Sequence, residues 1–142
     1  MIVLNLILVG ALTITSYRSV PEQTDDSPYF TSIGDRTGIH GCAISPDLLC
    51  PLAIGQYKVH TRNMCTYKEK LHYGDWLQID GVGIREINDV THPKIHNTID
   101  VWVETYAQEK AFGIQHRQVF LVEPTYVETA RRNTQSYMEL GR

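Results

Sequence analysis

The stretch DWLQIDGVGIREIND, residues 75–89, predicts a β-hairpin. In its first half, Leu77 and Ile79 alternate with polar residues, as in a strand with one buried face. The glycine-containing residues 81–83 predict a turn, and residues 84–89 predict the returning strand. This hairpin contains the clearest of several short strands that the sequence predicts.

Short strands are also predicted on both sides of the hairpin. Residues 98–103 place Ile99 and Val101 on one face and Asp100 and Trp102 on the other. The remaining predicted strands are 12–17, 41–45, a short one near 56–61, and 117–123, which we expect to end at Pro124.

One short helix is predicted after these strands. Thr105 and Gln108 match a capping box, and Gly113 matches a helix stop, so that the helix covers residues 106–112. Many short strands, one helix and glycine-rich turns favour a mainly β fold, a small closed barrel, over α/β layers.

Composition narrows the class of protein. The 142 residues are 42% apolar, which suffices for one domain with a single core. A net charge of −3 and the lack of a basic run argue against a nucleic-acid partner and against a polybasic membrane patch.

Residues 1–11 form an apolar run that predicts a signal peptide and hence export. The run is shorter than the about 20 residues that a membrane-spanning helix needs, so no stable membrane span is expected. No Lys or Arg precedes it, however, and the alternatives are a buried first strand or a poorly processed anchor.

The chain has three cysteines, and this odd number leaves at least one thiol without a disulfide partner in the chain. In an exported protein the favoured disulfide joins Cys50 to Cys65, while Cys42, in a small apolar stretch, is expected to be a buried free thiol. We expect no metal or cofactor, because His92 and His96 are separated by Pro93 and no zinc-ligand spacing accompanies them.

Several segments, in order, resemble the three-aspartate (3D) domain family. They are residues 16–17, 24–25, 34–41, 43–47, 74–83, 88–90, 99–101 and 111–113, with Val119 downstream, and together they cover about residues 13–123. The resemblance implies a six-stranded double-psi β-barrel, similar to the catalytic domain of membrane-bound lytic transglycosylase A and to rare lipoprotein A, and more distantly to expansins.

The resemblance also divides the chain. The barrel domain would cover residues 12–124, and residues 125–142 would form a C-terminal tail. The chain departs from the family pattern in two places, an insertion at about residues 52–70 and the sequence Val-Thr-His that follows Asp89.

The function that the resemblance implies is a peptidoglycan lytic transglycosylase. Such an enzyme cleaves the bond between N-acetylmuramic acid and N-acetylglucosamine and leaves a 1,6-anhydro end. Asp100 would be the catalytic acid and base, which requires a raised pKa, and Asp89 would stabilise positive charge in the same groove. Taken without the resemblance, Asp89 is better interpreted as a strand-end residue that bonds its own loop backbone.

Further residues are candidates for binding the glycan. Trp102 could stack on a sugar ring or be a core aromatic residue, and Asp75 could be a turn residue instead. The complete set of substrate-binding candidates is Asp75, Asp35, Thr37, Tyr17, Trp102, His92 and His96.

Other function classes stay open at this point. They are a non-catalytic, expansin-like module that binds cell-wall glycan, a muramidase-type hydrolase, and a protein-interaction or inhibitor role. We expect a secreted or periplasmic, wall-associated monomer of bacterial or phage origin, whose partner is the peptidoglycan glycan strand.

Overall fold

The computed structural model describes residues 1–20, 38, 40–51, 65 and 71–126. Six strands close into a barrel in the order β1-β5-β2-β4-β3-β6. The pairs β1–β5 and β2–β4 are parallel and the other four are antiparallel. The elements are β1 (Ile2–Tyr17), β2 (Gly41–Ile44), the 3-10 turn η1 (Pro46–Leu48), β3 (Trp76–Ile79), β4 (Gly83–Val90), β5 (Thr98–Trp102), α1 (Tyr106–Phe112) and β6 (Gln115–Tyr126).

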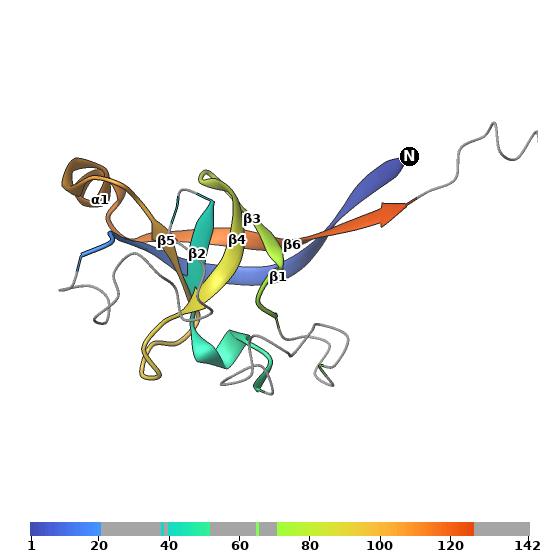
Figure 1. Ribbon diagram of the computed structural model, residues 1–142, viewed down its shortest axis with the longest axis horizontal. Coiled ribbons are helices and arrows are strands. Elements are labelled where there is room, and N and C mark those ends of the chain that lie inside the picture. Colours follow the sequence, from blue (N-terminus) through green and yellow to red (C-terminus); the bar gives the residue numbers. More distant parts are fainter. Residues whose placement is uncertain (21–37, 39, 52–64, 66–70, 127–142) are drawn as a thin grey trace, which may run out of the picture.

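This architecture confirms the predicted fold class, a mainly β protein built on a six-stranded barrel with a short helix. The barrel lies in the middle of the molecule, and α1 lies at one end of it (Figure 1).

The core fills the inside of the barrel. A strand places successive side chains on opposite faces, so alternate residues of each strand point inward. Most of these inward side chains are aliphatic. Those that are wholly or almost wholly buried include Ile14, Ile44, Leu77, Ile79, Ile87, Ile99, Val101 and Val119. The free thiol of Cys42 lies among them.

Local sequence signals set the turn and the helix. Gly81 and Gly83, with φ of 76° and 119°, adopt the left-handed conformations that reverse the chain between β3 and β4. The N-cap of α1 is Thr105, whose hydroxyl accepts a hydrogen bond from the backbone N–H of Gln108. In return, the side-chain Oε1 of Gln108 accepts from the backbone N–H of Thr105. The predicted hairpin and the predicted capping box are therefore both confirmed.

The first and last strands are longer than predicted. β1 begins at Ile2, and its first residues pair with the end of β6, so the two strands project from the barrel as a ribbon (Figure 1). The prediction that β6 ends at Pro124 is wrong, because the strand continues to Tyr126. Pro124 pairs with Leu4 in the ribbon, beyond the last contact of β6 with β3, and proline is tolerated on such an edge.

The signal peptide at residues 1–11 stays a prediction. Among the described residues, no helix is long and apolar enough to cross a membrane.

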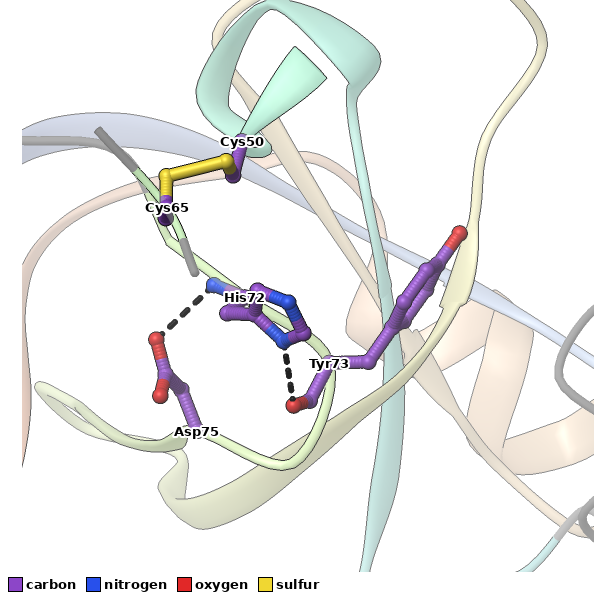
Figure 2. Close-up of a disulfide and its surroundings, with 5 residues drawn as sticks. All are labelled: Cys50, Cys65, His72, Tyr73 and Asp75. Carbon is purple, nitrogen blue, oxygen red and sulfur yellow. Dashed lines mark hydrogen bonds between the residues drawn. A yellow bond between two sulfur atoms is a disulfide. The ribbon is translucent and has the colours of Figure 1, made fainter. Parts of the chain in front are cut away.

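A disulfide fastens the chain beside η1. Cys50 is bonded to Cys65, the pairing that the sequence favours, with a Cα–Cα distance of 6.2 Å (Figure 2). The Cys50 amide also donates to the Leu71 carbonyl at 2.7 Å, and Leu71 donates to Leu48. The predicted strand near residues 56–61, most of the insertion and most of the C-terminal tail lie outside the described residues.

Candidate functional site

Two aspartates flank one small residue on the barrel wall. Ala43 of β2 pairs with Asp100 of β5 on one side and with Asp89 of β4 on the other. Residues paired across a sheet point to the same face, and neighbouring strands are ~4.8 Å apart, which puts the two aspartate α-carbons roughly 10 Å apart. The pairing thus brings together the two predicted catalytic carboxylates.

A β-bulge decides that Asp89, and not its neighbour, takes this place. β2 and β4 are in register at Cys42 and Ile87, but the next pair is Ala43 with Asp89. The extra residue, Asn88, is left unpaired in the ladder and is buried. Bulges re-aim side chains in this way and occur often beside active sites.

Asp100 lies in a partly dehydrated position on the outer face of β5. Its neighbours Ile99 and Val101 point into the core and are wholly buried. Thr15, the residue paired with it in β1, donates its hydroxyl to Oδ1 of Asp100 at 2.9 Å. Among the described residues, a single neutral donor, Thr15, therefore orients the carboxyl.

The pKa of Asp100 is raised to about 6, chiefly by burial of the carboxyl group. The hydrogen bond from Thr15 lowers this pKa, because it stabilises the charged form, whereas the negative charges of Glu109 and Asp89 raise it. An aspartate with such a pKa is partly protonated near neutral pH, so it can both give and take a proton.

Tyr17 contributes a protonated hydroxyl to the same region. The side chain is 5% exposed, and burial raises the pKa of Tyr17 strongly. The negative charges of Asp89 and Asp100 raise this pKa further, so the phenol lies within electrostatic range of both carboxylates. Among the predicted binding residues, Tyr17 therefore lies near the two aspartates.

Asp89 uses part of its hydrogen-bonding capacity locally. Its Oδ1 accepts from the backbone amide of Val90 at 2.9 Å. This is the strand-end contact that the sequence left open as an alternative, and it coexists with the position of Asp89 beside Ala43. The contact holds the Asp89 carboxylate at the end of β4.

Trp102 follows Asp100 by two residues on the same face of β5 and pairs with Tyr17. Its indole Nε1 donates to the Ser19 hydroxyl at 2.8 Å, which fixes the ring. The residue also lines a cavity of about 470 Å³ at the end of the barrel, between the β3–β4 turn, the end of β5 and α1. It is therefore neither a core residue nor remote from the carboxylates.

The other predicted binding residues are not brought to the aspartate pair. Asp75 is buried in a turn beside the disulfide, where its Oδ2 accepts from the His72 amide at 2.8 Å (Figure 2). His92 and His96 are exposed in the loop between β4 and β5, where His92 Nδ1 accepts from the amide of Lys94. The candidates Asp35 and Thr37 lie outside the described residues.

Three residues of this region were not found from the sequence. They are Thr15, Glu109 and Arg85. Glu109 lies on α1, where it accepts from Nε of Arg18 at 2.8 Å. The strand pattern of residues 12–17 places Thr15 on the outward face. The neighbouring sequence does not show, however, that its hydrogen-bond partner is Asp100, 85 positions away.

No protein-family model and no curated protein matches the chain. The resemblance to the three-aspartate domain therefore rests on the segments quoted above and stays a prediction. Within the described ranges, no group of three or more His, Cys, Asp or Glu side chains could hold a metal ion.

Proposed function

We propose that this protein is a glycan-cleaving enzyme of the lytic transglycosylase type, acting on peptidoglycan, with Asp100 as its acid and base. The observation that carries the proposal is the half-buried Asp100, with a pKa of about 6, set beside Asp89 on one face of the barrel. An exported, wall-associated location is part of the same proposal, and the disulfide agrees with it.

The reaction needs two proton transfers, both through the carboxyl group of Asp100. Protonated Asp100 gives its proton to the glycosidic oxygen as the bond to the anomeric carbon breaks. The carboxylate that results then takes the proton of the C6 hydroxyl of the same sugar, whose oxygen attacks the anomeric carbon. The product is a 1,6-anhydro ring, and Asp100 is protonated again, so the step consumes no water.

The neighbours of Asp100 suit this cycle. Thr15 holds the carboxyl in place through its hydroxyl. Positive charge develops on the sugar as the bond breaks, and the negative charge of Asp89, on the far side of Ala43, stabilises it. Tyr17 keeps its proton at neutral pH and can donate a hydrogen bond to the substrate.

The test is mass spectrometry of the soluble products released from purified peptidoglycan. The wild-type protein should release anhydro-muropeptides, and Asp100→Asn should lower the rate by about a hundredfold to ten-thousandfold. Asp80→Asn removes an exposed carboxylate in the β3–β4 turn and serves as the matched control.

Each other outcome has a defined meaning. Products with reducing ends would mean that the protein is a glycan-cleaving enzyme that works by hydrolysis and not by transglycosylation. Full activity of Asp100→Asn would overturn the role of Asp100. Binding to the wall without any released product from wild type would make the protein a glycan-binding module.

A further inference from the structure

The cavity at the end of the barrel contains a charge that the proposed reaction does not use. Arg85 of β4 lines this cavity together with Trp102. Trp102 lies two residues beyond Asp100 on β5, roughly 7 Å along the strand. The cavity is thus next to the carboxylate pair but separate from it.

Arg85 points into the barrel. It pairs with Leu77 of β3, and it lies two residues before Ile87 on β4, and both of these side chains are wholly buried. Residues at these positions share one face of the sheet, which here is the inner face. Burial raises the pKa of Cys42, and the positive charge of Arg85 opposes that shift, so the guanidinium lies near the core thiol. An arginine therefore occupies a position that the other strands fill with aliphatic residues.

The guanidinium is poorly satisfied. Its Nη1 donates to the carbonyl of Ile84 at 2.9 Å, while its buried Nε makes no hydrogen bond to any residue that the structure describes. No carboxylate in the described part of the chain lies within ion-pair distance of Arg85. A half-buried charge without a counter-ion is costly and is normally explained by a bound group of opposite charge.

The lining of the cavity specifies the kind of anion. Val82, Val101 and Phe112 supply apolar walls, and Glu104 supplies a negative charge to the same lining. One arginine opposed by one glutamate suits a singly charged group better than a phosphate dianion. Arginine presents parallel N–H donors that match the two oxygens of a carboxylate.

We propose that this cavity, with Arg85 as its anchor, binds a carboxylate that carries a small apolar substituent. The inference rests on the proposed function, because it makes the cavity a subsite for the glycan that Asp100 cleaves. In peptidoglycan such a carboxylate can belong to the lactyl group of a muramic acid ring or to the end of its peptide. The two sources share the chemistry and differ in whether a sugar ring is attached.

The test uses Trp102 as the reporter. The chain has two tryptophans, and Trp76 is 41% exposed on β3, so Trp76→Phe leaves Trp102 as the single tryptophan, which is excited selectively at wavelengths that tyrosine does not absorb. This protein is titrated with N-acetylmuramic acid, with D-alanyl-D-alanine and with the uncharged N-acetylglucosamine. Saturable quenching or enhancement is expected with at least one of the two carboxylates, and none with N-acetylglucosamine.

Substitution of the anchor distinguishes specific binding from general charge attraction. Arg85→Gln should weaken binding of the carboxylate about tenfold or more, and Arg85→Lys should weaken it less. Lys110→Gln, which removes an exposed positive charge of α1, should change nothing. Thermal melting of each variant checks that it is folded. If Arg85→Gln does not fold, the proposal is still tested by the weaker binding expected of Arg85→Lys and by the comparison with uncharged N-acetylglucosamine.

The outcomes separate this inference from the proposed reaction, since binding requires no turnover. The proposed subsite is wrong if neither carboxylate changes the Trp102 fluorescence when Arg85 is intact. It is also wrong if Arg85→Gln and Arg85→Lys leave the fluorescence response unchanged. Carboxylate binding by an Asp100→Asn protein that releases no products supports it independently of catalysis. Binding of the dipeptide alone would assign the subsite to the peptide, and binding of N-acetylmuramic acid alone to the sugar.

Discussion

At the level of single residues, the protonation of Asp100 is the balance of four influences. Burial raises its pKa, the hydrogen bond from Thr15 lowers it, and the charges of Glu109 and Asp89 raise it again. These neighbours come from three different elements, β1, α1 and β4. A substitution in any one of them can therefore change the acidity of Asp100 without touching its side chain.

Two substitutions should shift the pKa of Asp100 in opposite directions. Thr15→Val removes the donor that stabilises the carboxylate, so the pKa should rise above about 6. Glu109→Gln removes a negative charge, so the pKa should fall. Carbon-detected NMR titration of the carboxyl group measures both shifts without need of a substrate. A shift of the same sign in both variants would contradict the electrostatic description.

The raised pKa also predicts a stability effect. Above pH 4 the unfolded chain holds Asp100 as a carboxylate, whereas the folded protein keeps the proton up to about pH 6, so the free energy of unfolding falls with rising pH in this window. Asp100→Asn removes this cost and should be more stable than wild type by on the order of 2 kcal/mol at pH 7.

Urea unfolding at several pH values checks this stability effect. The two curves should converge below pH 4, where wild-type Asp100 is protonated in both states. A difference that stays constant between pH 3 and pH 7 would show that burial of Asp100 is not its cause.

At the level of elements, the four-residue strand β2 organises the site. It pairs antiparallel with β5 and parallel with β4, so that residues from both strands lie at the level of Ala43. The bulge at Asn88 then selects Asp89 for the position beside Ala43. None of these features can be read from a local pattern, because strand order and register depend on partners far away in the chain.

The bulge gives a prediction that leaves both carboxylates intact. A Cβ placed on Gly41 would lie 2.7 Å from Nδ2 of the buried Asn88, so Gly41→Ala should displace Asn88 and move the adjacent Asp89. The expected cost is about 1–3 kcal/mol of stability, and product release should fall about tenfold to a hundredfold.

Gly38→Ala is the matched control for this substitution, since no atom of the described residues lies within 4 Å of its added Cβ. It should leave stability and product release close to those of wild type. Equal effects of the two substitutions would mean that the contact between Gly41 and Asn88 does not position Asp89.

At the level of the whole molecule, the sequence predicted what local signals determine. The hairpin turn at Gly81 and Gly83 and the capping box of α1 follow from backbone conformation and from hydrogen bonds between near neighbours. The course of β6 through Pro124 was missed, because proline excludes a strand only where its missing N–H is needed. The unpaired Arg85 inside the barrel was missed as well, since its sequence position alone does not show which face is inward.

In the first eleven residues, strand β1 extends well beyond the buried core. β1 begins at Ile2, yet no side chain before Leu12 is buried, while Leu12 is 3% exposed and Ile14 wholly buried. The pairing of β1 with β5 lies within Thr13–Tyr17. Residues 1–11 therefore contribute backbone pairing to β6 but little to the core.

A protein that starts at Leu12 should for this reason fold into the same barrel. It keeps the β1–β5 ladder and the pairs of Leu12, Thr13 and Ile14 with β6, and it loses the exposed apolar residues of the ribbon. Circular dichroism and thermal melting of the two proteins make the comparison, and intact-mass analysis of exported protein shows where the chain is cut. Unfolding of the shortened protein would contradict the expectation, because removal of a signal peptide must leave a barrel that can close without it.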